Sequence, residues 1–124
     1  MIKRLLMTVL LAAFFGLSAQ NQASAQVFST KLKVTVIDKI GNVVEDAKVI
    51  LYRTKADYQK EVNEVQKFKL TNAKGQVTFK KLEARSYYVL VRKGDMDNIG
   101  GGEIVDTLVQ GRLNKANIVI SDGL

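Results

Sequence analysis

Apolar and polar residues alternate along most of the chain after residue 30. Residues 31–36 show the pattern first, because leucine and valine take every second position between lysine and threonine. A period of two indicates a β-strand with one buried face and one solvated face. Residues 47–52 and 87–92 are apolar at consecutive positions near their centres, which indicates strands covered on both faces. Further strands are predicted at residues 67–71, 77–79, 104–109 and 114–120, the last with Ile118 and Ile120 facing inward.

Turn residues separate these strands. Gly41 and Asn42 follow the first strand, and both are able to take a positive φ. Residues 72–75 lie between two alternating stretches, so we expect a β-hairpin there, closed by Gly75 in the left-handed conformation. Residues 53–64 break the alternation with a polar stretch that is either a short helix or an ordered loop, and a loop with one helical turn is favoured.

The pattern as a whole predicts an all-β fold. Residues 26–124 contain 21 Val and Ile against 8 Leu, a bias towards β-branched side chains that suit pleated sheets. About seven short strands without a long helix predict an antiparallel Greek-key β-sandwich, formed by a single domain at residues 26–124. Residues 95–102, which include three consecutive glycines, are expected to form a mobile surface loop.

The first 25 residues have the features of a secretory signal peptide. Lys3 and Arg4 precede an apolar run of 13 residues at 5–17, which is shorter than the roughly 20 needed to span a bilayer. Ala23 and Ala25 give the small-x-small pattern of a cleavage site. We therefore expect a signal-peptide helix, residues 1–25, that is removed after Ala25 and leaves a soluble periplasmic or extracellular protein. An uncleaved membrane anchor is the alternative.

Composition narrows the possible chemistry. The sequence has no His, Cys, Pro or Trp, so it lacks the residues of Ser-His-Asp and Cys-His nucleophile systems, of ordinary zinc, copper and haem sites, and of disulfides. No convergent set of carboxylate, Lys or Tyr side chains defines a reaction, and we expect a protein that is not an enzyme. The 19 basic and 12 acidic residues give a net charge of +7, which becomes +5, or 17 against 12, without residues 1–25.

Several of these segments together resemble a known family. The residues that carry the resemblance are Val34-x-Val36-x-Asp38-x-x-Gly41-Asn42-x-Val44, Ala47-x-Val49-x-Leu51, Thr71-Asn72-Ala73-Lys74-Gly75-x-Val77-x-Phe79-x-x-Leu82 and Tyr87-Tyr88-Val89-x-Val91. They are similar to the carboxypeptidase regulatory-like domain over roughly residues 31–94. The resemblance implies a transthyretin-like (prealbumin-like) sandwich and a small secreted bacterial member of that family. The sequence departs from the family at residues 83–85, where Pro or Gly is usual.

The same resemblance implies no catalytic residue. In carboxypeptidases the zinc chemistry belongs to a separate domain, and the hydroxyisourate hydrolases and intradiol dioxygenases of this fold need His, which the sequence lacks. Pilin-type domains of the fold carry a Lys–Asn isopeptide crosslink that needs a nearby acidic residue. Lys31 or Lys33 and Asn117 would supply two members of such a site, whereas residues 89–92 of the Tyr-rich strand hold no acid.

An acidic, glycine-rich segment suggests a site for a hard cation. Five oxygen-bearing side chains fall within 12 residues, namely Asp95, Asp97, Asn98, Glu103 and Asp106. Oxygen ligands are those that Ca²⁺ takes, although Ile99 stands where an EF-hand loop has a ligand. Acidic residues beside glycines are also commonly just solvated. Calcium binding is therefore one of two interpretations of this segment, and no other cofactor is expected.

Two further features suggest a ligand-binding surface. Lysines stand at outward positions of several predicted strands, and would form a basic face for an acidic polysaccharide, a lipid headgroup or nucleic acid if the strands align, namely Lys31, Lys33, Lys67, Lys69 and Lys80. Lysines on strands also simply keep sheets soluble, and an exported protein is not expected to bind nucleic acid. Tyr58, in the polar stretch, is the best candidate for an exposed ring that stacks on a sugar. The candidate ligand-binding residues are thus Tyr58, Lys67 and Lys69.

These observations define a class of function without a specific activity. We expect a non-enzymatic, exported β-sandwich that acts as a binding or structural accessory module for an envelope protein or glycan. No stable membrane insertion is expected once the signal is cleaved. The alternative is a small calcium- or carbohydrate-binding protein of the cell envelope.

Overall fold

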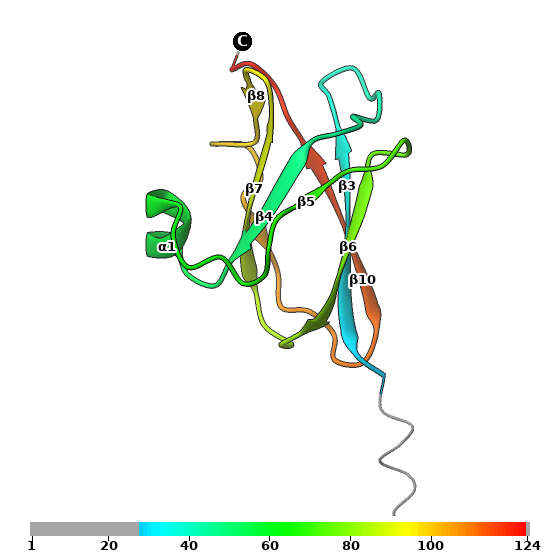
Figure 1. The fold of residues 1–124 in the computed structure, drawn as a ribbon, viewed down its shortest axis with the longest axis vertical. Helices are drawn as coiled ribbons and strands as arrows, with labels where there is room; N and C mark the ends of the chain where they lie inside the picture. Colours follow the sequence, from blue (N-terminus) through cyan, green and yellow to red (C-terminus); the bar gives the residue numbers. More distant parts are fainter. Residues whose placement is uncertain (1–27, 124) are drawn as a thin grey trace, which may run out of the picture.

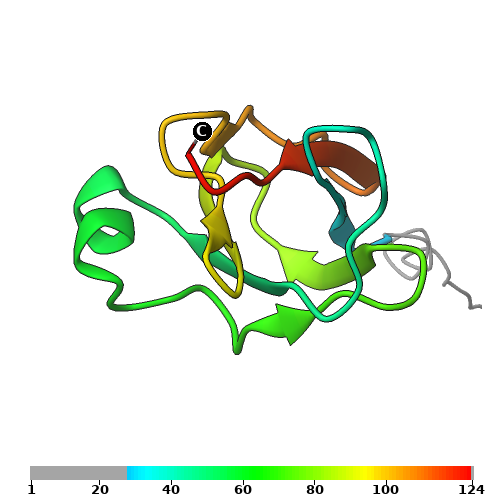
Figure 2. The same ribbon diagram turned by 90° about the horizontal axis from the view of Figure 1, so that it is seen from above.

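The computed structural model describes residues 28–123, which form two facing β-sheets and one short helix (Figures 1 and 2). The predicted signal peptide lies outside the described residues. Within residues 28–123, no helix is long and apolar enough to cross a membrane. The all-β sandwich predicted from the sequence is confirmed.

The smaller sheet has three strands in the order β10-β3-β6. They are β3 (Thr30–Ile37), β6 (Gln76–Leu82) and β10 (Leu113–Val119). Every second residue of β3 is buried, as its alternating sequence predicts. β6 runs antiparallel to β3, whereas β10 runs parallel to it, with Lys115 opposite Lys33. This parallel pair joins the two ends of the domain and is an exception within an otherwise antiparallel sandwich.

The larger sheet has five strands, with β7 (Tyr87–Lys93) in a central position. On one side β7 pairs with β4 (Lys48–Tyr52), and β4 pairs with the short β5 (Lys69–Leu70). On its other side β7 pairs with β8 (Met96–Asp97) and β9 (Ile104–Val105). The central place of residues 87–92 is therefore confirmed.

The main hydrophobic core lies between the two sheets. Phe79 and Tyr87 are the largest fully buried side chains, and Ile118 and Ile120 point inward as predicted. Most of the remaining core consists of small and medium aliphatic residues from both sheets, namely Leu32, Val34, Val36, Val49, Leu51, Val77, Val89 and Val91. Burial of these side chains is the main stabilising contribution, since the chain has no disulfide.

The prediction that the strands on either side of residues 72–75 pair as a β-hairpin is wrong. β5 pairs with β4 and β6 pairs with β3, so the two strands belong to different sheets. The turn itself forms, because Gly75 has a φ of +73° and its N–H donates to the carbonyl of Asn72 at 2.8 Å. The buried Thr71 hydroxyl accepts from Ala47 N–H (2.8 Å) and donates to the Val44 carbonyl (2.6 Å), which holds the end of β5 beside β4.

The polar stretch contains α1 (Lys55–Lys60), in agreement with the favoured helical turn. The Thr54 hydroxyl caps the helix by accepting from Asp57 N–H at 3.1 Å, and Glu61 ends it in the left-handed conformation. α1 lies against the outer face of the larger sheet, away from the smaller sheet (Figure 2). There Tyr58 joins a second apolar cluster with Ile50, Tyr52 and Leu90. This cover explains why β4 and β7 are apolar on both faces.

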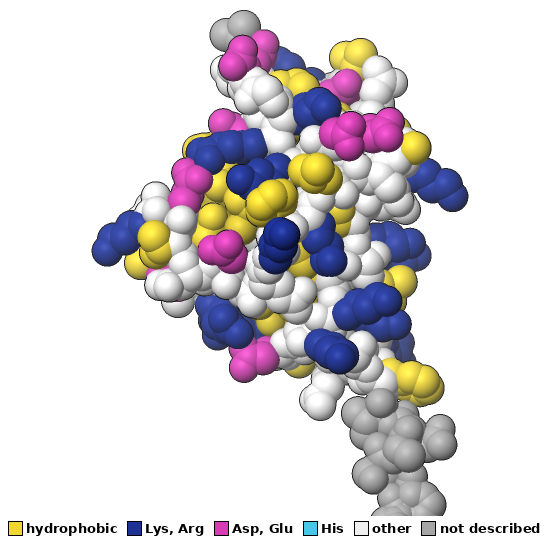
Figure 3. Space-filling view, viewed as in Figure 1, with side chains coloured by type: hydrophobic (Ala, Val, Ile, Leu, Met, Phe, Trp, Pro, Cys, Tyr) yellow, Lys and Arg dark blue, Asp and Glu magenta, His cyan; other side chains and the backbone are white. Residues whose placement is uncertain are grey.

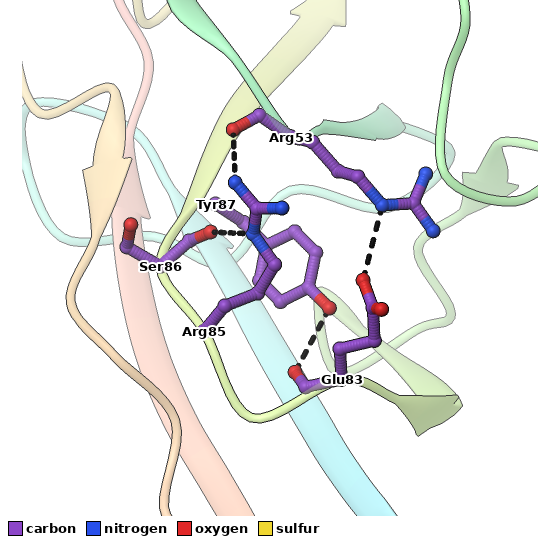
Figure 4. Close-up of polar contacts among 5 residues, drawn as sticks. All are labelled: Arg53, Glu83, Arg85, Ser86 and Tyr87. Atoms are coloured by element: carbon purple, nitrogen blue, oxygen red, sulfur yellow. Dashed lines mark hydrogen bonds and ion pairs between the residues drawn. The ribbon is translucent and has the colours of Figure 1, made fainter.

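A polar network closes the turn between β6 and β7 (Figure 4). The Tyr87 hydroxyl donates to the Glu83 carbonyl four residues earlier, at 2.9 Å. Arg85 crosses to the end of β4 and donates to the Arg53 carbonyl at 2.9 Å, while Arg53 forms an ion pair with Glu83 at 3.1 Å. A buried Tyr bonded to upstream backbone is a common corner device of β-sandwiches. Here it shapes the turn at the point where the sequence departs from the resembled family.

Candidate functional site

The outer face of the smaller sheet is basic. Lys31 and Lys33 point outward from β3, Lys80 from β6 and Lys115 from β10. Lys33 and Lys115 are direct partners in the parallel register. Figure 3 shows Lys and Arg side chains gathered on the side of the molecule where β3 and β6 lie. We call Lys31, Lys33, Lys80 and Lys115 the basic face.

No acidic side chain accompanies these lysines at the outward positions of the three strands. Within residues 28–123, none of the four lysines forms an ion pair, and the described pairs Arg53–Glu83 and Arg92–Glu61 lie elsewhere. The other outward positions carry short polar or aliphatic side chains, namely Thr35, Ile37, Gln76, Thr78, Leu113, Asn117 and Val119. The face is thus a positively charged surface with hydroxyl and amide groups, and the exposed aliphatic Leu113 and Val119, between the charges.

The structure divides the five lysines predicted to form one face. Lys31, Lys33 and Lys80 come together, while Lys69 lies in β5 of the other sheet and Lys67 lies two residues before it. The Lys69 ammonium stands 5.8 Å from the centroid of the Phe79 ring. Lys115 was not among the predicted residues, although the alternation of residues 114–120 placed it on the outward side. Only the pairing of β10 with β3 brings it beside Lys33.

Tyr58 is not the exposed ring that the sequence suggests. Its side chain is 8% exposed, because α1 turns it onto the sheet, where its ring lies 5.6 Å from Tyr88 and 6.0 Å from Tyr52. Its hydroxyl donates to Oε2 of Glu103 at 2.5 Å. Burial and this bond raise the pKa of the Tyr58 hydroxyl, so it stays a hydrogen-bond donor at neutral pH.

A pocket of about 260 Å³ opens beside α1. Tyr58, Tyr88 and Leu90 supply its aromatic and apolar lining, and its polar lining comes from both α1 and the 99–103 loop, namely Lys55, Gln59, Glu61 and Glu103. We call this the α1 pocket. The pocket forms only when the chain folds, because Tyr88, Ile99 and Glu103 come from segments far along the chain from Tyr58.

Two carboxylates of the α1 pocket have fixed partners. Glu103 Oε2 accepts from the Gly100 N–H at 2.9 Å as well as from Tyr58, and these bonds lower the pKa of Glu103. Glu61 forms a two-pronged pair with Arg92, at 2.6 and 2.8 Å, which lowers the pKa of Glu61. Both carboxylates are therefore charged near neutral pH and are held in place by these partners in the pocket lining.

The five residues of the predicted calcium segment have separate environments. Asn98 is buried and binds the backbone of β7, while Asp97 accepts from Ile99 N–H at 3.0 Å. Glu103 belongs to the α1 pocket, Asp95 lies in the exposed turn after β7, and Asp106 is exposed after β9. Among residues 28–123, no group of three acidic side chains is gathered closely enough to hold a metal ion.

The residues considered for an isopeptide crosslink lie on the outer surface. Lys31, Lys33 and Asn117 all point away from the core. The inward positions at the same level of β3 and β10 are occupied by Val34, Val36 and Ile118. This part of the core is therefore apolar and offers no Lys–Asn–acid arrangement.

Comparison with known proteins identifies the fold. No protein-family model and no curated protein sequence matches the chain. Solved structures that are similar to it include the backbone protein of group B streptococcus pilus 2b, with 14% identity, a TM-score of 0.54, and coverage of 73% of this chain and 40% of that chain. A streptococcal ancillary pilin has 17% identity and a TM-score of 0.58, and the match covers 77% of this chain and 33% of that chain. BcpA, the major pilin subunit of Bacillus cereus, has 14% identity and a TM-score of 0.53, and the match covers 77% of this chain and 31% of that chain.

The likeness defines the class of the fold. Residues 28–123 have the β-sandwich architecture found in domains of these pilins. The chain spans between about a third and two fifths of the length of these three pilin structures.

Proposed function

We propose that the protein is an exported, non-enzymatic β-sandwich that acts as a binding and structural accessory module of the cell envelope. The basic face is the observation that carries this proposal. Three strands from distant parts of the sequence bring four lysines to one surface, and the outward positions of these strands carry no acidic residue. The similar structures are a pilus backbone protein, an ancillary pilin and a major pilin subunit, which agrees with a structural role at a cell surface.

The partner that best fits the basic face is an acidic polysaccharide of the envelope. Repeated lysines attract a polymer of negative charge, and the intervening Thr35, Thr78 and Asn117 offer hydrogen bonds to sugar hydroxyls. Nucleic acid fits less well, because the outward positions of the three strands carry no aromatic ring on which a base would stack. Two exposed aliphatic residues, Leu113 and Val119, lie at outward positions of β10, but the outward positions of the three strands carry no Trp or Phe of the kind that helps to anchor a protein in a lipid surface.

Binding to polygalacturonate, a polymer of uronic acid, tests this function. With four lysines engaged, a fourfold rise in salt concentration is expected to weaken the association constant by about 50-fold. Dextran, a neutral polymer, is expected not to bind. Binding that does not change with salt, or tighter binding to anionic phospholipid vesicles or to DNA than to the polysaccharide, would contradict the proposal.

A matched pair of triple variants locates the site. Replacing Lys31, Lys33 and Lys115 by Gln removes three charges from the basic face and is expected to abolish most of the binding and of its salt dependence. Replacing Lys60, Lys67 and Lys69 by Gln removes the same charge from the side of the larger sheet. Equal loss in both variants would show that net charge, and not the basic face, is responsible.

We also propose that export proceeds through cleavage after Ala25. The support comes from the sequence of residues 1–25, which lie outside the described residues. The mass of the protein recovered from the periplasm or medium should correspond to a chain that begins at Gln26. Recovery of the uncleaved chain in the membrane fraction would contradict this proposal.

Within the sandwich class, we propose membership of the carboxypeptidase regulatory-like family. The support is the set of motif residues that the structure places in the core, including Val34, Val36, Val49, Leu51 and Phe79. A comparison of homologous sequences that joined the chain to another sandwich family would contradict it.

A further inference from the structure

The α1 pocket combines an aromatic wall with polar groups at its rim. We propose that it binds a single neutral sugar ring, at a site separate from the basic face. The inference does not rest on the polyanion proposal, because it concerns the opposite sheet and a ligand without charge.

The size of the pocket fits one ring. The pocket has a volume of about 260 Å³. Clefts for larger organic ligands span about 300–1,000 Å³. The α1 pocket lies just below this range, which suits a ligand of roughly a dozen non-hydrogen atoms, the size of a pyranose.

Tyr88 provides the stacking surface. Tyr88 is partly exposed and lines the pocket, and its ring packs against that of Tyr58 at 5.6 Å between centroids and with a tilt of 33°. Tyr52 packs edge-on against Tyr58 at 6.0 Å, so the three rings form one cluster on the sheet. An aromatic ring fixed in this way presents an apolar face to the C–H side of a sugar at little entropic cost.

The rim supplies both acceptors and donors. Within residues 28–123, both hydrogen bonds to the Glu103 carboxylate end on Oε2, which leaves Oε1 to accept from a sugar hydroxyl. The Gln59 amide and the Lys55 ammonium line the same pocket from α1. Lys55 opposes a cationic ligand and Glu103 opposes an anionic one, so the lining favours a neutral molecule that both donates and accepts.

NMR titration of the purified protein tests the site directly. The probes are the methyl glycosides of glucose, galactose, mannose and N-acetylglucosamine at millimolar concentrations. At least one is expected to bind with a Kd in the millimolar range, the affinity usual for a ligand of this size. It should shift the amide signals of residues 55–61, 88–90 and 99–103, and the affinity should be the same at low and high salt because the ligand is neutral.

Variants separate this site from nonspecific contact. Tyr88→Ala is expected to weaken binding at least tenfold, whereas Tyr88→Phe keeps the ring and should bind normally. Phe68→Ala removes an exposed aromatic residue outside the pocket and should also bind normally. Gln59→Ala changes only an exposed helical residue, and should weaken binding if Tyr88→Ala proves poorly folded. Unmoved signals with all four probes, or normal binding by both Tyr88→Ala and Gln59→Ala, would overturn the proposal.

Discussion

The side chain of Asn98 makes hydrogen bonds to β7 that the backbone of a neighbouring strand would otherwise make. β8 pairs with residues 92–93 of β7 and β9 pairs with residues 87–88, which leaves residues 89–91 without a strand on that edge. The Asn98 amide fills the gap by donating to the Val89 carbonyl at 2.8 Å and accepting from the Val91 N–H at 2.9 Å. Asn98 thus anchors residues 95–102 to β7, although the glycines of this segment predict a mobile loop.

Replacement of Asn98 by Ala is expected to lower the free energy of unfolding by about 3 kcal/mol. The reason is that buried polar groups of Val89 and Val91 lose their partner. Urea denaturation measures the change, with the exposed Asn117→Ala as a control that should cost much less. A loss of stability in N98A that appeared only in the presence of calcium would instead point to a metal ligand.

The bond between Tyr58 and Glu103 predicts a dependence of stability on pH. It lowers the pKa of Glu103 below its usual 4.5, so its contribution is present above that pH and is lost as the pH falls through the lowered value. Tyr58→Phe should therefore lower the free energy of unfolding by about 1 kcal/mol at neutral pH and by less near pH 3. Urea denaturation at the two pH values checks this. An equal loss at both would mean that the bond contributes no charge-dependent stability.

At the scale of elements, the turn at residues 72–75 shows why sequence patterns misassign strand partners. The local chemistry of the turn is predictable, because Gly75 is needed at a positive φ. Gly75 also packs against the end of β3, where an added Cβ would lie 2.8 Å from the Val36 carbonyl oxygen and 2.9 Å from the Val43 Cβ. The turn therefore delivers β6 to β3 and does not fold it back onto β5.

Gly75→Ala and Gly94→Ala form a matched comparison of turns. Both residues have a positive φ, +73° and +58°, but a Cβ at Gly94 meets nothing within 4 Å. We expect G94A to cost about 1 kcal/mol from backbone strain, and G75A to cost about 3 kcal/mol because steric overlap is added. Thermal or urea denaturation measures both. Equal costs would mean that the packing of Gly75 against β3 is not important for stability.

At the scale of the whole molecule, the basic face has a cost in stability. Lys33 and Lys115 are direct partners on neighbouring strands, and like charges in that position repel. The fold keeps them together without an acidic neighbour at the outward positions of β3, β6 and β10. An anionic partner would remove the repulsion, so the same arrangement that lowers stability favours the proposed binding.

Lys115→Gln is expected to raise the free energy of unfolding by about 0.5 kcal/mol at low salt, because it relieves this repulsion. The gain should disappear at high salt, where the charges are screened. Urea denaturation at the two salt concentrations measures it, with Lys67→Gln as a control outside the face. A stabilisation that persists unchanged at high salt would have to arise from another cause, such as β-propensity.

Local sequence was sufficient for much of the fold and for little of the candidate sites. The strand at residues 31–36, the central strand beginning at Tyr87 and the inward-facing Ile118 follow from periodicity, since side-chain direction in a strand alternates with every residue. The exposure of Tyr58 was predicted wrongly, because a single helical turn decides which way its ring points. Lys115 joined the basic face only through the parallel pairing of β10 with β3.

The sequence by itself determined a Val- and Ile-rich sandwich core, the inward and outward faces of its strands, and the absence of His- and Cys-based chemistry. These properties are local or compositional, so no knowledge of strand partners is needed to derive them. The tertiary structure decided which strands pair, and hence which lysines share a face and which rings and carboxylates line the α1 pocket. Both surfaces join segments far apart in the chain, and the partners of such segments are set by packing of the whole domain.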